Sequence, residues 1–417
     1  MLGQHQRGII PSDVSSVDPA VAAHLATLAG WRRRSPEEQW LALGGEDIPF
    51  APGVEPADGR IRVGLFCPCL GLGGAEAWQL ALADAVNPDA LIWRGAAVTE
   101  GKRSVAPAML GQLARRMPVG FGLGAARTLA AACDVIISWS VLDHEFLFRG
   151  LERPPRVALA CHFPAELPWT AAAEQLLSRV DRLVAVSELA VDSLPGSLRT
   201  RADVIWNAVD ATRLVPTEHP DATRAAWGLA PGSPVAGYLG RLSPEKDPGA
   251  MLRLAEHLPE SWSVVIVGDG REDETLRARI AGLDANRVRL VPGTAEVGNA
   301  LAAFSTLVVP SRFESFGLTM AEGFRAGVPV ISTRVGLAKL VPGLTRPIGF
   351  VSSGTEIAEA ILADHQSPRA TADRVARAQG FARERLDLGR FGREWTDLIL
   401  NLAQSNRTFQ PGSLHVA

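Results

Sequence analysis

Lysine is nearly absent from this sequence. Lys102, Lys246 and Lys339 are the only three, and arginine supplies the rest of the 42 cationic residues. The 45 acidic residues leave a formal net charge of -3, so the overall charge gives no reason to expect nucleic-acid binding. With so few lysines, each one deserves individual consideration as a site residue.

Long apolar runs are also missing, and cysteine is rare. No stretch approaches the roughly 18 consecutive apolar residues that predict a membrane-spanning helix, and the N-terminus lacks the basic and apolar segments of a secretory signal. The four cysteines are spaced as neither a zinc site nor a disulfide framework; they are Cys67, Cys69, Cys133 and Cys161. These absences favour a soluble protein in the reducing cytoplasm.

The composition is that of a globular chain, with 47% hydrophobic and 21% charged residues. A length of 417 residues exceeds one ordinary core, so two domains are expected. Short apolar runs without strict alternation are separated by helical segments from residue 60 onward, a pattern typical of buried parallel strands. The first series of predicted strands is IRVGLF, DALIW, DVIISW, RVALA, RLVAVS and DVIW; the second is PVAGYLG, SVVIVG, RVRLVPG, STLVVPS and VPVIST. Two such series predict an α/β protein with two Rossmann-like, doubly wound parallel sheets, which bind ligands at the cleft between them.

The domain boundaries follow from changes in this pattern. A polar, proline-bearing segment near residues 208 to 232 separates the two series. The predicted parts are an N-terminal helical appendage with a linker (1–58), a first Rossmann-like domain (59–212), a second (213–390), a C-terminal helix returning to the first domain (391–405) and a flexible tail (406–417).

The stretch ESFGLTMAE has a glutamate at each end, Glu314 and Glu322. It follows a predicted strand, and LTMAEGFRAG predicts a helix that ends at Gly327, so the loop lies at the carboxyl edge of the second sheet. Backbone N–H groups and a helix N-terminus there suit an anionic or heavily hydroxylated ligand. An isolated glutamate pair is more often a solvated surface feature, so the pair alone does not indicate a site.

A second loop at the same edge is cationic. GRLSPEKD, residues 240 to 247, places Arg241 and Lys246 directly after the first strand of that sheet. Arginine can bind a diphosphate as a bidentate fork and lysine as a point charge. A cationic loop and a carboxylate-bearing loop at one sheet edge favour a ligand site over a chance arrangement.

In order and spacing, GRLSPEKD, VGDG, VPSRFESFGLTMAE and AGVPVIST resemble the donor domain of the family 4 retaining glycosyltransferases. Glu314 and Glu322 match the E-x7-E signature of that family. The N-terminal half is similar to the family at LGLGGAEAW, LVAVSE and VIWNAVD, although Ala208 stands where the family usually has glycine. The resemblance covers about residues 60 to 402 and implies the GT-B fold, with an acceptor domain and a nucleotide-sugar donor domain facing across a cleft.

The resemblance also implies roles for the residues of the donor domain. Arg241 and Lys246 would neutralise the donor diphosphate. Glu314 would hydrogen-bond the sugar hydroxyls, and Glu322 would hold the ribose hydroxyls of the nucleotide. The backbone amides that complete the cradle for sugar and phosphate would be those of Phe316, Gly317 and Leu318.

On the acceptor side the resemblance is weaker. It implies that Gly73 and Gly74 open a helix facing the diphosphate, and that His162 lies near the transferred sugar. Trp139, His144 and Trp169 are further candidates to line this side, although core packing is the commoner role of a tryptophan. The acceptor itself stays open between a saccharide, a lipid-linked saccharide, a peptide and a small molecule.

The implied reaction is transfer of a hexose-type sugar from a UDP- or GDP-sugar with retention of configuration. Preorganised cations and a helix N-terminus would stabilise the departing diphosphate. If the acceptor attacks the same face, the departing phosphate oxygen can take its proton, so no protein base is needed; a covalent intermediate on Glu314 is the alternative. No D-x-D pair occurs, so no metal or other cofactor is expected.

Other functions remain open from the sequence. The main alternative is a nucleotide-sugar epimerase or hydrolase of the same two-domain fold; a glycoside hydrolase and a donor-binding protein without activity are others. A G-x-G-x-x-A match at residues 120 to 125 is weak evidence for a dinucleotide oxidoreductase, and the preceding GQLARRMPV looks helical where such a site needs a strand. The N-terminal appendage is a candidate to contact an acceptor, a partner subunit or, peripherally, a membrane surface; a solvated helix packed on the N-terminal domain is an equal alternative.

Overall fold

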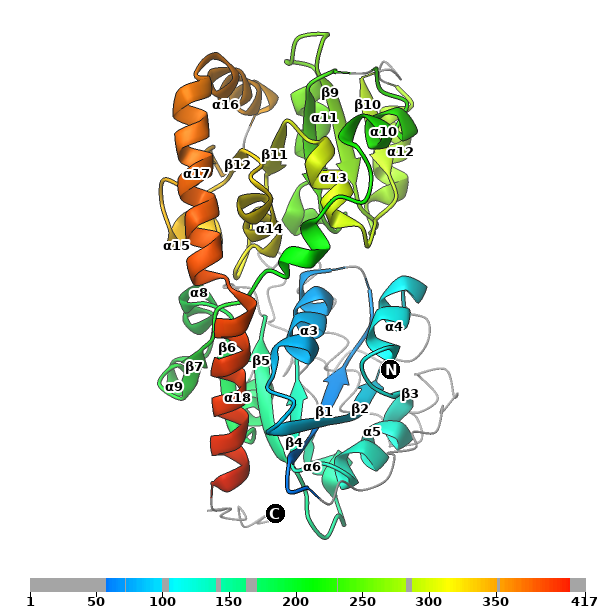
Figure 1. The fold of residues 1–417 in the computed structure, drawn as a ribbon, viewed down its shortest axis with the longest axis vertical. Helices are drawn as coiled ribbons and strands as arrows, with labels where there is room; N and C mark the ends of the chain where they lie inside the picture. The colour runs from blue at the N-terminus through cyan, green and yellow to red at the C-terminus, as the bar shows by residue number, and fades with distance from the viewer. Residues whose placement is uncertain are drawn as a thin grey trace, which may run out of the picture.

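The computed structural model describes residues 58–71, 73–99, 105–139, 144–162, 171–230, 232–282, 287–350 and 353–405. It forms two α/β domains that follow one another along the long axis of the molecule (Figure 1). The predicted appendage, apart from Asp58, and the predicted tail lie outside the described residues. None of the helices in the described ranges is long and apolar enough to span a membrane.

The N-terminal domain contains a seven-stranded, all-parallel sheet in the order β3-β2-β1-β4-β5-β6-β7. Its strands are buried in the centre, as the continuous apolar runs predict. The strands are β1 (Ile61–Cys67), β2 (Leu91–Val98), β3 (Val119–Phe121), β4 (Val135–Ser138), β5 (Arg156–Cys161), β6 (Arg182–Ala185) and β7 (Ala202–Val204). The helices are α3 (Gly74–Ala85), α4 (Pro107–Ala114), α5 (Gly122–Ala131), α6 (His144–Phe148), α7 (Ala171–Ser178), α8 (Glu188–Asp192) and α9 (Gly196–Arg199).

The C-terminal domain contains a six-stranded parallel sheet in the order β10-β9-β8-β11-β12-β13. Its strands are β8 (Val235–Leu239), β9 (Ser263–Val267), β10 (Val288–Val291), β11 (Thr306–Val309), β12 (Val330–Ser332) and β13 (Arg346–Pro347). Its helices are η3 (Ala211–Leu214), α10 (Pro220–Ala226), η4 (Pro244–Lys246), α11 (Gly249–Ala255), α12 (Asp273–Ile280), α13 (Val297–Ala303), α14 (Leu318–Ala326), α15 (Leu337–Leu340), α16 (Gly354–Gln366) and α17 (Pro368–Arg385). In both sheets the strand order reverses beside the first strand, which places the carboxyl ends of the central strands at a ligand-binding edge.

One segment differs from the expectation. GQLARRMPV was expected to be helical, but α4 ends at Ala114 and β3 begins at Val119, so a strand does precede the G-x-G-x-x-A match. Pro118 stops the helix, and three residues are too few to show a strand pattern. The match still lacks the context of a dinucleotide site, because the next strand, β4, is followed by Trp139 where the acidic residue would be needed.

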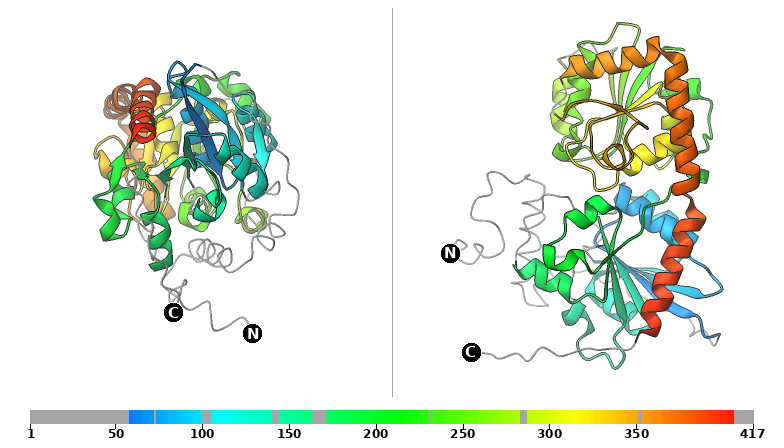
Figure 2. Two further views of the ribbon diagram at one scale, coloured as in Figure 1. Left: turned by 90° about the horizontal axis from the view of Figure 1, so that it is seen from below. Right: turned by 90° about the vertical axis from the view of Figure 1, so that its left-hand side faces the viewer.

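The chain crosses between the domains twice. The first crossing runs through residues 205 to 210, and the second joins α17 to α18 (Leu388–Gln404). Figure 2 shows these two helices running along one side of both domains. The two crossings are joined by a hydrogen bond from the Val209 N–H to the Leu386 carbonyl, 3.0 Å long. Helix α18 buries one face against the N-terminal sheet; this face consists of Phe391, Trp395, Ile399 and Leu402.

Candidate active site

A cavity of about 380 Å³ lies between the facing edges of the two sheets. Loops after β8, β9, β10 and β11 line it from the C-terminal domain, and the start of α3, part of α4 and the ends of β4 and β5 line it from the N-terminal domain. All ten site residues implied by the resemblance lie in its wall; they are Gly73, Gly74, His162, Arg241, Lys246, Glu314, Phe316, Gly317, Leu318 and Glu322. Gly73 and Glu322, which are 249 positions apart in the sequence, therefore share one site.

The loop between β11 and α14 depends on glycine for its path. Gly317, the residue that precedes α14, has a φ of +87°, and a Cβ there would lie 2.3 Å from Cε of Met320. Gly336 approaches the same loop, since its Cβ would lie 2.5 Å from the Phe316 carbonyl oxygen. That carbonyl accepts a 2.8 Å hydrogen bond from the Leu337 N–H. The glycines thus let the loop turn sharply into α14 and direct the first N–H groups of the helix at the cavity.

Lys246 and Glu314 form an ion pair within this wall. Nζ of Lys246 lies 2.7 Å from Oε2 of Glu314, and the Ser311 hydroxyl donates to Oε1 at 2.9 Å. Lys246 ends the short helix η4, and Glu314 belongs to the loop after β11. The two loops that the sequence placed at one sheet edge therefore meet directly, and both charged groups are held in place.

Glu322 is buried rather than solvated. Only 8% of the residue is exposed, in the second turn of α14. Burial raises the pKa of its carboxyl to about 7, and the nearby Arg213 cation acts in the opposite direction. No hydrogen bond joins its carboxyl to another residue in the described part of the chain, and it lies in the wall of the cavity. This is the expected state of a group that receives its hydrogen-bond partners from a ligand.

Arg213 is a site residue that the sequence did not reveal. It lies on η3, in the polar segment after the first domain crossing, and it lines the cavity. Its Nε is buried and has no hydrogen-bond partner among the described residues. It lies three residues beyond VIWNAVD, outside every quoted motif, and the high arginine content gave no reason to single it out.

On the N-terminal side, Gly73 and Gly74 form the start of α3, as expected. Glu76 follows in the first turn and is almost completely buried, with 1% of its side chain exposed. Its Oε2 lies 4.0 Å from Nη2 of Arg241, which comes from the loop after β8. Charged groups of both domains thus approach each other across the cavity.

His162 follows β5 and lies between two tryptophans. Its ring centroid is 5.0 Å from that of Trp78 and 6.4 Å from that of Trp139, both in edge-on arrangements. Burial lowers the pKa of His162 to about 3, so the imidazole is neutral at physiological pH. Its Nε2 has no hydrogen-bond partner among the described residues, which leaves one polar atom available at the acceptor side.

The other acceptor-side candidates, Trp139, His144 and Trp169, differ in whether they line the cavity. Trp139 lines the cavity, and its Nε1 donates to Oε1 of Gln79 at 3.1 Å. His144 is not part of the wall formed by the described residues; it stacks on Phe66, with ring centroids 6.4 Å apart. Trp169 lies outside the described residues.

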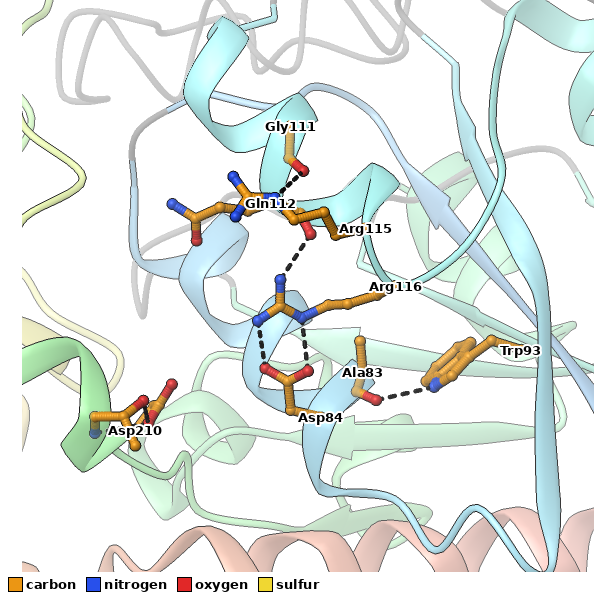
Figure 3. Close-up of polar contacts among 9 residues, drawn as sticks. Ala83, Asp84, Trp93, Gly111, Gln112, Arg115, Arg116 and Asp210 are labelled. Carbon is orange, nitrogen blue, oxygen red and sulfur yellow. Dashed lines mark hydrogen bonds and ion pairs between the residues drawn. The ribbon is translucent and has the colours of Figure 1, made fainter.

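Helix α4 contributes two wall residues that the sequence did not single out, Met109 and Gln112. The helix is fixed to α3 by a double hydrogen bond between the Arg116 guanidinium and the Asp84 carboxylate, with both distances 2.6 Å (Figure 3). Arg116 also donates to the Gln112 carbonyl at 2.6 Å. The acceptor-side wall therefore has a defined position relative to the start of α3.

The C-terminal domain matches a known family model. Residues 220–362 match the family described as "Glycosyl transferases group 1". This range contains the cationic loop, the loop with Glu314 and most of the second sheet.

Curated relatives match over a similar length. The D-inositol 3-phosphate glycosyltransferase of Mycolicibacterium smegmatis is 33% identical over 192 residues, which cover 43% of this chain and 44% of that protein. The protein of the same name from Nocardia farcinica is 32% identical over 237 residues, 50% of this chain and 51% of that protein. The matches thus span about half the length of these relatives.

Solved structures extend the similarity to both domains. The Anabaena protein HepE, in complex with UDP-glucose, has a TM-score of 0.70 and 20% identity, and the alignment covers 82% of this chain and 100% of that structure. A glycosyltransferase from Rickettsia africae has a TM-score of 0.66 and 13% identity, with 83% and 100% covered. At such identities these likenesses establish the fold alone. The family model and the relatives support the resemblance to the family 4 glycosyltransferases, and residues 220–362 match the group 1 glycosyltransferase model. The solved structures show that the two facing parallel sheets form a GT-B fold.

Proposed function

We propose that this protein is a retaining glycosyltransferase that moves a hexose-type sugar from a nucleotide diphosphate donor, such as a UDP- or GDP-sugar, to an acceptor hydroxyl. The observation that supports this most strongly is the convergence of Arg241, Lys246, Glu314 and Glu322 on one cavity at the start of α14. Two cations, a helix N-terminus and two carboxylates suit the three parts of such a donor, which are diphosphate, sugar and ribose.

The arrangement explains how the donor would be activated. Departure of the nucleotide leaves negative charge on the diphosphate. Arg241, Lys246 and the first N–H groups of α14 are placed to stabilise that charge as it forms, without rearrangement. Because these groups can supply the electrostatic stabilisation, the proposed reaction needs no metal ion.

Retention would follow from attack on the face of the sugar that the diphosphate leaves. The acceptor hydroxyl passes its proton to the departing phosphate oxygen, so that the new glycosidic bond forms as the old one breaks. Glu314 is engaged with Lys246 at 2.7 Å and with Ser311 at 2.9 Å, which favours a binding role over that of a covalent nucleophile. His162, which is uncharged and whose Nε2 has no hydrogen-bond partner among the described residues, would donate or accept a hydrogen bond at the sugar.

The relatives support a small hydroxylated acceptor as a first candidate, since their name refers to D-inositol 3-phosphate. The proposal also includes a saccharide, a lipid-linked saccharide or a peptide as the acceptor. It further includes peripheral contact of the protein with a membrane. A reducing, cytoplasmic setting is also part of it, supported by the four cysteines, none of which forms a disulfide bond with another described residue. The comparisons do not favour the alternative of an epimerase or hydrolase.

A panel of nucleotide sugars tests the proposal through thermal unfolding. A donor that binds only the folded protein stabilises it by about 2.7 kcal/mol at 100 times its dissociation constant, so UDP-glucose or another donor should raise Tm by several degrees. Glu322→Ala should reduce the rise, whereas Glu174→Ala, in the first turn of α7 and outside the cavity, should not. If no nucleotide sugar raises Tm, the transferase proposal is wrong. If the donor is consumed equally fast with water alone and with every acceptor tried, the result supports the hydrolase alternative.

A further inference from the structure

The contact between Glu76 and Arg241 has an unusual asymmetry. The Glu76 carboxylate is buried, and its Oε2 has no hydrogen-bond partner among the described residues. The Arg241 side chain is 53% exposed, and its Nη2 stops 4.0 Å from that oxygen. This distance is longer than a hydrogen bond, so the guanidinium faces the carboxylate but keeps its N–H groups free for another partner.

The Glu76 side chain is held in a fixed position. Its Oε1 accepts from the Cys69 thiol at 3.6 Å, and it lies beside the glycine loop that leads into α3. A Cβ at Gly73 would lie 2.6 Å from Oε2 of Glu76 and 2.8 Å from Nη2 of Arg241. Glycine at position 73 is therefore what allows the two charged groups to approach each other.

Charge gives this contact a consequence for the donor. An acidic group in the first turn of a helix is attracted by the helix dipole, so Glu76 uses part of the positive end of α3 that would otherwise attract a diphosphate. With Arg241 absent, the carboxylate would repel an anion that enters the cavity at Gly73 and Gly74. With Arg241 in place, the cation lies between the two anions and attracts both.

We propose that Glu76 is a positioning residue for Arg241. The buried carboxylate keeps a long and flexible side chain at the start of α3, where its fork meets the diphosphate of the incoming nucleotide sugar. The conformational entropy that the Arg241 side chain would lose on binding the donor is therefore already lost in the free protein. This inference rests on the proposed function, because the ligand is the donor diphosphate. It implies that the charge of Glu76 helps donor binding while Arg241 is present and opposes binding when Arg241 is absent.

A double-mutant cycle with UDP as the probe tests this change of sign. Isothermal titration would give the dissociation constant of UDP for the wild type, Glu76→Gln, Arg241→Ala and the double variant. We expect Glu76→Gln alone to weaken UDP binding about three- to tenfold, and Arg241→Ala to weaken it by more. In the Arg241→Ala background, Glu76→Gln should tighten binding by about threefold, since it removes a repelling charge.

Two controls make the outcome decisive. Glu174→Gln makes the same substitution in the first turn of another helix of the N-terminal domain, α7, outside the cavity, and it should leave UDP binding unchanged. If Glu76→Gln does not fold, Glu76→Asp can replace it, because it keeps the charge but withdraws the carboxylate from Arg241 by one methylene; it should weaken UDP binding more with Arg241 present than in Arg241→Ala. Effects of the same sign and size in both backgrounds would show a purely structural role and overturn the inference. A wild-type protein that binds neither UDP nor UDP-glucose would instead overturn the proposed function.

Discussion

The Lys246 ammonium and the Glu314 carboxylate lie 2.7 Å apart, although the resemblance assigns one to the phosphate and the other to the sugar. Ser311 holds the second oxygen of the carboxylate at 2.9 Å. The pair is partly shielded from water, with 27% of the lysine and 12% of the glutamate side chain exposed. A donor bound here would therefore place the bond between sugar and phosphate beside a preformed pair of opposite charges.

Lys246→Ala should slow turnover far more than it weakens donor binding. The lysine charge matters most as the diphosphate gains negative charge in the transition state, so we expect UDP release from UDP-glucose to fall by about 10²- to 10³-fold. Glu322→Ala should instead mainly raise the dissociation constant of UDP, because its partner would be the ribose. Titration of UDP and steady-state UDP release separate the two quantities. Similar changes in both quantities for both variants would contradict this division of roles.

Glu322 should make stability depend on pH. Burial raises its pKa to about 7 in the folded protein from the ordinary value of 4.5. The folded state therefore favours the protonated carboxyl: this contribution is fully present below about pH 4.5 and is lost as the pH rises through about 7. Relative to Glu322→Gln, the free energy of unfolding should decrease by on the order of 3 kcal/mol across this range. Urea unfolding of both proteins between pH 4.5 and 8 measures it, and parallel curves would show that Glu322 is ionised in the fold.

His162 should make stability depend on pH in the opposite direction to Glu322. Its pKa is lowered to about 3, so the unfolded chain binds a proton below about pH 6.5 while the folded protein does not. Its contribution to stability is present above about pH 6.5 and is lost as the pH falls toward about 3. His162→Gln should therefore be less sensitive to acid than the wild type in thermal melts between pH 4 and 7. A ring proton that titrates near pH 6.5 in NMR spectra would refute a neutral His162.

Trp395 tests how firmly α18 holds the N-terminal domain. It is 1% exposed and packs edge-on against Trp78 at 5.5 Å and Phe391 at 6.3 Å. Trp395→Ala should destabilise the protein by about 3 to 5 kcal/mol. Trp395→Phe should cost much less, because it keeps the aromatic packing and removes an N–H that has no hydrogen-bond partner among the described residues. Urea unfolding and hydrogen exchange at α3 amides would compare the two; equal losses would argue that α18 is held elsewhere.

Sequence patterns predicted the parallel sheets well because buried strands are marked by apolar residues alone. Two strands were missed, β3 and β13, with three and two residues; such short edge strands carry too few side chains to form a pattern. The helix that ends at Gly327 was predicted correctly, and Gly327 has the left-handed conformation of a helix end, with a φ of +77°.

Residues of the site could be predicted from the sequence only where they belong to a recognised motif. Glu314 and Lys246 lie in adjacent strand-end loops, so topology alone brings them together. The cavity positions of Arg213, Met109 and Gln112 depend on how the two domains meet, which local sequence does not encode. The burial of Glu76 was equally hidden, because an acidic residue in the first turn of a helix is ordinarily a surface feature.

The return of α18 to the first sheet has a consequence for how the protein is made. The face of α18 that contains Phe391 and Trp395 completes the core of the N-terminal domain, yet it is separated from that domain by the whole second sheet. During synthesis the first domain leaves the ribosome with an uncovered apolar surface, and it can be completed only after more than 170 further residues, from 213 to beyond 385, have been translated. The N-terminal domain is therefore translated first but completes its hydrophobic core last.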